Sequence, residues 1–349
     1  MDYFILNTPS GVLNREAAVA PRGDDPFGMP VGRGPIVDAS EVTLRSENLS
    51  EAEASKLRRD PANVVGPVMP LVLVAPCRNA DYGLPEVDAL EAAAGAAWGI
   101  GDIGADATDE TGAGVRVAVL DTGIDDAHPA FAGVDLRTSR NFIGGGGTDV
   151  TDRHGHGTHC AGTLFGRSVG ETRIGVAPGI TEALIGKVLD DKGHGTTGGL
   201  LDALYWAGLE KRVDVISMSL GFDFPGMRER LMKEEGLPPT LATSRTLTAY
   251  RENLRAFETM FNLITQEGSG NPGVVIVAAS GNESLRNRNP KFVIDATLPG
   301  AASPNVISVG ATMRVPDGIG IAPFSNINPV LWPRGSTSCP PPRAVDSSP

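Results

Sequence analysis

Apolar residues in the middle of the chain fall in short runs that are separated by amphipathic stretches. Five runs rich in Val, Ile, Leu and Ala predict buried strands, over Val115–Leu120, Ala183–Val188, Val213–Met218, Val274–Ala279 and Val306–Val309. Between these strands the pattern predicts helices over Gly157–Gly166, Thr197–Ala207 and Ser244–Gln266. Buried strands that alternate with helices are typical of a mainly parallel sheet with helices on both faces, so we predict an α/β fold of three layers.

The helix predicted over Ser244–Gln266 has the clearest period. Its apolar residues recur at spacings of three and four and form a single face, which we expect in the hydrophobic core. They are Leu247, Tyr250, Leu254, Phe257, Phe261 and Ile264.

The same patterns divide the chain into four parts. Residues 1–40 are rich in Gly, Pro and Asp and have no period, so we expect loop or disorder there. Residues 41–97 hold a small α+β segment and a linker, and residues 98–331 hold the alternating strands and helices. Residues 332–349 form an aberrant, proline-rich tail that fits neither pattern.

The α+β segment carries its own signals for secondary structure. We expect a strand over Glu41–Arg45, followed by a helix that ends near Arg59. Ser50 and Glu53 have the spacing of a capping box at the start of that helix. The apolar run Val64–Ala75, which is broken by prolines, predicts further strand structure.

The composition excludes several classes of function. The 349 residues carry a formal net charge of −12, with an isoelectric point near 4.9. This argues against a nucleic-acid partner, because such binding requires clustered positive charge. No apolar run reaches the roughly 20 residues that span a bilayer. The start of the chain, MDYFILNTPS, lacks the basic and apolar regions of a signal peptide, so we expect a cytoplasmic protein with no membrane partner.

Three polar residues are candidates for chemistry, and two of them, Asp121 and Asn282, follow predicted strands, where α/β proteins bind ligands. Asp121 directly follows a strand, and its carboxylate could orient a histidine, bind a metal or cap a helix. His156 begins a predicted helix, and a neutral imidazole can take a proton from a nucleophile if a carboxylate holds its other nitrogen. Asn282 follows the strand over Val274–Ala279, where its amide could donate to an oxyanion or belong to an ordinary Gly-Asn turn.

The histidines around His156 leave other interpretations open. His154, His156 and His159, together with Cys160, are residue types that bind zinc. Alternatively, one or two of these histidines cap the predicted helix.

The sequence blocks around these residues resemble those of the subtilases, the subtilisin-like serine proteases. The blocks are VAVLDTGI at Val117–Ile124, HGTHCAG at His156–Gly162, SMSLG at Ser217–Gly221 and SGN at Ser280–Asn282. They occur in the order found in the family and at roughly its spacing. The resemblance extends from Trp98 to about Leu331, and it implies a subtilisin-like fold that hydrolyses peptide bonds through an Asp/His/Ser triad.

The resemblance also implies roles for individual residues. Asp121 would orient the imidazole, His156 would act as general base and then as general acid, and Asn282 would donate to the oxyanion. Two segments would bind an extended peptide by β-augmentation: Ser219, Leu220 and Gly221 on one side, and Gly193, His194 and Gly195 on the other. Residues 41–75 resemble the end of an inhibitory propeptide. The expected partners are therefore a protein or peptide substrate and the chain's own N-terminal segment.

The family's nucleophile block, G-T-S-M-A-x-P, has no counterpart in this sequence. Ser338 mimics its serine, but the prolines Pro340–Pro342 prevent the helix that should follow. A back-translation of Trp332–Val345, read two nucleotides along, can give APGVDVLSAAPGG, which resembles the family's sequence ahead of the nucleophile. We therefore hypothesise a frameshift or sequencing error near Leu331, and we expect the chain as given to be inactive.

No cofactor is assigned from the sequence. Many subtilases bind calcium through the Asp of an H-P-D-L block, but Ala130 stands at that place here, so we name no metal-binding residues. Three hypotheses follow: a serine endopeptidase that is truncated before its nucleophile, a non-catalytic peptide-binding protein of the same fold, and a metallohydrolase that uses the histidine cluster.

Overall fold

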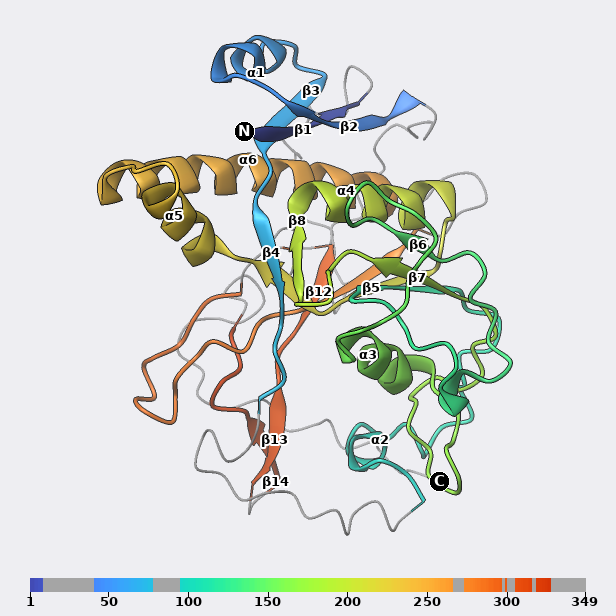
Figure 1. The fold of residues 1–349 in the computed structure, drawn as a ribbon. Coiled ribbons are helices and arrows are strands. Elements are labelled where there is room, and N and C mark those ends of the chain that lie inside the picture. Colours follow the sequence, from blue (N-terminus) through green and yellow to red (C-terminus); the bar gives the residue numbers. More distant parts are fainter. Residues whose placement is uncertain are drawn as a thin grey trace, which may run out of the picture.

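The computed structural model describes residues 1–8, 41–77, 95–265, 273–296, 299, 305–315 and 318–327. A six-stranded sheet lies at its centre, with neighbouring strands parallel and in the order β12-β11-β9-β5-β7-β6 (Figure 1). The strands are β5 (Val117–Asp121), β6 (Arg140–Asn141), β7 (Ala183–Lys187), β9 (Val215–Met218), β11 (Val275–Ala279) and β12 (Val306–Val309). Each of the five buried strands expected between Val115 and Val309 lies in this sheet.

Helices lie on both faces of the sheet. They are α4 (Thr197–Tyr205) and α6 (Pro239–Thr265) on one face and α3 (His156–Phe165) on the other (Figure 1). The larger buried cluster joins α4 and α6 to the sheet, and a smaller one joins α3 to β5 and β7. The prediction of a three-layer α/β fold is therefore confirmed.

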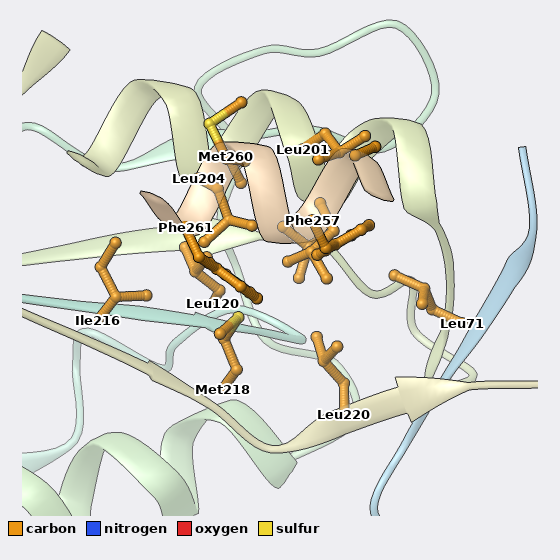
Figure 2. Packing of buried hydrophobic residues seen from close by; sticks show 14 of the residues in the cluster. Leu71, Leu120, Leu201, Leu204, Ile216, Met218, Leu220, Phe257, Met260 and Phe261 are labelled. Atoms are coloured by element: carbon orange, nitrogen blue, oxygen red, sulfur yellow. The ribbon is translucent and has the colours of Figure 1, made fainter. Parts of the chain in front are cut away.

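The face of α6 that points to the sheet carries large apolar side chains. Phe257 and Phe261 are fully buried, and they pack beside Leu120 of β5 (Figure 2). The expectation that Leu247 belongs to the same buried face was wrong, because its side chain is 49% exposed. In this first half of the helix, the buried positions are held by small residues such as Ala249.

A separate three-stranded antiparallel sheet is built from the N-terminal part of the chain (Figure 1). Its elements are β1 (Asp2–Asn7), β2 (Thr43–Asn48), α1 (Glu51–Leu57) and β3 (Asn63–Pro67). The capping box of Ser50 and Glu53 is present at the start of α1. The expectation of loop or disorder over residues 1–40 was wrong for β1, because its apolar residues form the buried centre of this sheet. Residues 9–40 lie outside the described residues.

A single strand connects this N-terminal sheet to the central domain. β4 (Pro70–Leu73) lies between β8 (His194–Thr196) and β10 (Leu220–Phe222) and is antiparallel to both. Two segments that follow strands of the central sheet, β8 after β7 and β10 after β9, thus lie on either side of a strand from the N-terminal part of the chain.

The remaining elements lie around this frame. They are α2 (Trp98–Asp102), η4 (Pro129–Phe131), η5 (Trp206–Glu210), α5 (Phe224–Lys233), β13 (Thr312–Val315) and β14 (Gly318–Ile321). The sequence patterns did not indicate α5, whose buried residues are only Met227 and Leu231. Among the helices described, none has both the length and the apolar character needed to cross a bilayer.

Candidate active site

An aspartate and a histidine meet where β5 ends and α3 begins. Asp121 is the last residue of β5 and His156 is the first residue of α3. The Oδ1 atom of Asp121 lies 2.7 Å from Nδ1 of His156. The Asp121 side chain is fully buried, and only 7% of His156 is exposed. The structure thus brings together two residues that sequence reasoning selected separately, 35 positions apart.

Both ring nitrogens of His156 face acceptors. Nδ1 contacts Asp121, and Nε2 lies 3.2 Å from the carbonyl oxygen of Val74. Burial alone would lower the pKa of the imidazole, but the hydrogen bond and charge of Asp121, with a smaller effect from Cys160, raise that pKa to about 10. A ring that donates from both nitrogens is an imidazolium, so this arrangement holds His156 in its protonated form.

The carboxylate of Asp121 is held mainly through one oxygen. Oδ1 also accepts from the backbone N–H of Thr122 at 2.7 Å. The other oxygen, Oδ2, is buried and has no hydrogen-bond partner among the residues described. Since an unpaired buried carboxylate oxygen is costly, the protonated ring of His156 is the main group that balances this charge.

Two glycines let the segments that carry Asp121 and His156 approach closely. A Cβ on Gly157, in the first turn of α3, would lie 2.3 Å from the carbonyl oxygen of Gly123. Gly123 itself has φ +117°, and a Cβ there would lie 2.3 Å from the carbonyl oxygen of Val150. The Asp-Thr-Gly and His-Gly-Thr blocks therefore fit one another backbone to backbone, which larger residues would prevent.

The segments expected to bind a peptide lie on either side of β4. The N–H of Val74 donates to the carbonyl oxygen of Ser219 at 2.9 Å, and the N–H of Leu73 donates to Gly193 at 3.0 Å. Leu220 and Gly221 pair with β4 on one side, and His194 and Gly195 pair with it on the other. β4 lies between them as an extended peptide would in β-augmentation.

The side chain of Asn282 points to the same stretch of chain. Its Nδ2 donates to the carbonyl oxygen of Ala75 at 2.9 Å. The loop that carries Asn282 is fixed by Asn326, whose Oδ1 accepts from the backbone N–H groups of Glu283 and Ser284. The His156 ring and the Asn282 amide therefore face neighbouring carbonyl groups, those of Val74 and Ala75.

The zinc interpretation does not fit this geometry. Within the described part of the chain, the grouped ligand-type atoms belong to Asp121, His156 and Cys160 and lie within 4.8 Å of one another. Two ligand atoms on one tetrahedral zinc would lie about 3.3 Å apart, whereas Asp121 and His156 approach to 2.7 Å, a hydrogen-bond distance. His154 and His159 are exposed and are not members of that group. Ala130 is buried.

Several residues around this pair were missed by sequence reasoning. Thr122 lies in the turn after β5, and Asp152 and Lys187 bind it through its hydroxyl and its carbonyl oxygen. The Lys187 side chain is buried. Of these three residues, only Lys187 has a signal in the sequence, because a lysine within an apolar run is unusual. Ser338, the weak candidate nucleophile, lies outside the described residues.

The chain is similar in sequence to several serine proteases. The intracellular serine protease of Paenibacillus polymyxa is 41% identical over 131 residues, which are 35% of this chain and 38% of that protein. Subtilisin E of Bacillus subtilis is 37% identical over 111 residues, 32% of this chain and 28% of that protein. A cuticle-degrading serine protease of Arthrobotrys oligospora is 31% identical over 224 residues, 62% of this chain and 42% of that protein.

The chain spans less than half the length of each of these relatives. The model of the subtilase family, however, matches residues 112–337, well over half of the chain and all of the central sheet. That match includes Asp121, His156 and Asn282. The chain therefore belongs to the subtilase family.

Proposed function

We propose that the protein is a serine endopeptidase in which Asp121 and His156 form the acid–base pair and Asn282 is the oxyanion donor. The observation that carries this proposal is the 2.7 Å contact between the Asp121 carboxylate and Nδ1 of His156, beside a groove that already holds an extended strand. The substrate is a protein or peptide bound between β8 and β10 in the way that β4 is bound.

The chemistry follows from the positions of these groups. With the groove open, Nε2 of His156 no longer faces the Val74 carbonyl, and in the neutral ring it can accept the proton of a serine hydroxyl as that serine attacks the scissile carbonyl. Asp121 holds Nδ1–H and stabilises the imidazolium that forms. Asn282 donates to the carbonyl oxygen as negative charge develops on it. His156 then returns its proton to the leaving amine.

The nucleophilic serine is absent from the sequence as given. We propose that it is absent because the reading frame changes near Leu331. The back-translation of Trp332–Val345, which can give APGVDVLSAAPGG two nucleotides along, supports this. Without the serine no acyl-enzyme forms, and in subtilisin, from which this magnitude is taken, losing it costs about 10⁶ in kcat.

Two measurements test this proposal. Sequencing the locus across codons 325–349 and beyond should reveal an in-frame G-T-S block. The 349-residue chain should then show no casein hydrolysis, whereas the frame-restored chain should hydrolyse casein and be blocked by a serine-directed phosphonyl reagent. No such block in any downstream frame would overturn the frameshift. Peptide binding without turnover by the restored chain would favour the non-catalytic alternative instead.

We also propose that the N-terminal segment is an intramolecular inhibitor of this site. Its strand β4 fills the groove, and its backbone is anchored by Asn253 and Thr197, which bind Pro67 O and Met69 N at 2.8 and 3.0 Å. The carbonyl at the base belongs to Val74, and the carbonyl at the amide donor belongs to Ala75. An attacked peptide bond would need the amide donor at its own carbonyl oxygen and the base beside the same group. Here the two contacts fall on different carbonyls, so neither peptide bond is positioned for attack.

The accessibility of His156 tests the inhibitory role without any need for turnover. Val74→Pro removes the N–H that binds Ser219 and should increase carbethoxylation of His156 by diethyl pyrocarbonate, measured by mass spectrometry. Val74→Ala keeps that N–H and serves as the control. Equal, slow modification of His156 in both folded variants would contradict the proposal.

The site of action inside the cell is also a proposal. It is supported by the likeness to a relative named as an intracellular serine protease. Fractionation of source cells with an antibody to this chain would test it, and recovery from the culture medium would overturn it.

A further inference from the structure

Asp152 lies at the centre of a hydrogen-bond network next to the Asp121–His156 pair. Its Oδ1 accepts from the hydroxyl of Thr122 at 2.9 Å and from the N–H groups of His154 and Gly155 at 2.9 and 2.8 Å. Its Oδ2 accepts from the N–H and hydroxyl of Thr158 at 2.9 and 2.7 Å. The five donors come from the turn after β5, from the loop before α3 and from the first turn of α3.

Thr122 connects this network to both members of the pair. Its N–H donates to Oδ1 of Asp121 at 2.7 Å, and its hydroxyl oxygen accepts from the N–H of Gly157 at 2.8 Å. Its carbonyl oxygen accepts from the buried ammonium of Lys187 at 2.5 Å. Thr122 is fully buried. The Thr122 hydroxyl thus joins Gly157, the residue after His156, to the carboxylate of Asp152, while the Thr122 backbone N–H binds Asp121.

The chemistry of Asp152 suits this role only while it is a carboxylate. Partial burial would raise the pKa of its carboxyl, but hydrogen bonds from Thr158, Gly155 and His154 outweigh this and lower it to about 2. A carboxylate can accept on both oxygens. An amide cannot, since its NH₂ group would face N–H donors on one side whichever way it is turned.

We propose that Asp152 and Thr122 are positioning residues that set the distance between the Asp121 carboxylate and the His156 imidazole. Two separate elements carry the pair, and the contacts that join them beside it include the Gly123–Gly157 backbone contact and this network. The inference rests on the proposed function only for the chemical roles of Asp121 and His156. The contact between these two residues can be measured whether or not the protein cleaves peptides.

The test uses the full 349-residue chain with ¹⁵N-labelled histidine. NMR would follow the His156 Nδ1–H signal and the pKa of the ring. Thr122→Val removes the hydroxyl without changing any charge, and it should lower the pKa of His156 by about one unit, a tenfold change in proton binding. Asp152→Asn should also lower the pKa of His156. Thr122→Ser keeps the hydroxyl and should restore both the signal and the pKa.

Asp149→Asn is the matched control. Asp149 lies in the same loop, is ionised by the same kind of hydrogen bonds and binds Thr151 and Arg153 rather than either side of the pair. It should leave the His156 signal in place. If Asp152→Asn does not fold, Thr158→Val, which removes one hydroxyl donor, should give a smaller shift in the same direction. Folded Thr122→Val and Thr158→Val with an unchanged pKa of His156 would overturn the proposal, even if both were less stable.

Different results would contradict the positioning role of Thr122 and Asp152 and the proposed peptidase function. A frame-restored chain that keeps the His156 signal but hydrolyses nothing would contradict the peptidase proposal alone. An active restored chain in which Thr122→Val leaves kcat, KM and the pH profile unchanged would contradict the positioning role alone.

Discussion

His156 has an acceptor at each ring nitrogen, and this determines how the protein responds to pH. Its pKa in the folded state, about 10, lies above the ordinary value of 6.5. The stability that the protonated ring contributes is therefore fully present below pH 6.5 and is lost as the pH rises through about 10.

We expect the free energy of unfolding of the native chain to exceed that of His156→Gln most at neutral and lower pH. The difference between the two proteins should shrink between pH 6.5 and pH 10, because only the native chain has the His156 ring to deprotonate. Urea titrations across that range measure it. A difference that stays constant with pH would contradict the assignment of an imidazolium to the folded state.

Gly157 tests the backbone fit between the two segments of the site. Gly157→Ala places a Cβ 2.3 Å from the carbonyl oxygen of Gly123, so either the turn or α3 must move. We expect a loss of about 1–3 kcal/mol in the free energy of unfolding, as for other overpacked positions, and a weaker His156 Nδ1–H signal. Gly99→Ala is the control, since a Cβ there meets nothing within 4 Å.

At the scale of elements, α6 holds the N-terminal sheet through a buried amide. Asn253 donates to the carbonyl oxygen of Pro67 in β3 at 2.8 Å. Asn253→Ala would leave that carbonyl without its donor, so we expect a loss of about 1–3 kcal/mol in the free energy of unfolding. Glu258→Ala, at an exposed position of the same helix, should change stability much less. Limited proteolysis should also cut the N-terminal segment faster in Asn253→Ala.

Elements with strong patterns could be predicted, and elements that depend on distant partners could not. The strands of the central sheet and the capping box of α1 followed from local patterns. β1 did not, because its partners β2 and β3 begin 36 or more residues later in the chain. The inward face of α6 was predicted correctly at Phe257 and Phe261, which are fully buried, and wrongly at Leu247, which is 49% exposed.

The site also contains residues that could be predicted from the sequence and residues that could not. Asp121, His156 and Asn282 were selected from sequence blocks, and the structure places all three around one stretch of chain. The roles of Thr122 and Asp152 could not be foreseen, because they depend on which oxygen meets which donor across a turn. The occupation of the groove by β4 is likewise a tertiary contact, made between residues more than 100 positions apart.

At the scale of the whole molecule, one face of the central sheet is only partly covered. Val275, Ile307 and Val309 are 48%, 49% and 48% exposed. Residues 307 and 309 pair with Val277 and Ala279, so these side chains share one face of β11 and β12. Parallel sheets are normally covered on both faces, and an apolar patch of this kind is unusual on a folded monomer.

We expect the frame-restored chain to cover this patch and the 349-residue chain to expose it. The dye ANS should bind the 349-residue chain more strongly, and its midpoint of thermal unfolding should be lower. Ile307→Thr should reduce dye binding by the 349-residue chain, whereas Ile103→Thr, at a residue that is 65% exposed elsewhere, serves as the control. Equal dye binding by both chains would argue against a missing structural element.

The position of β4 has a consequence for any peptide that arrives from solution. Because β4 is covalently joined to a sheet that packs on α6, it competes for the groove at an effective concentration in the millimolar range. A free peptide with the same sequence and the same intrinsic affinity would have to reach a comparable concentration to occupy half of the molecules. In the proposed inhibitory role of the N-terminal segment, a tightly binding peptide or an event that detaches the N-terminal sheet would make the groove available.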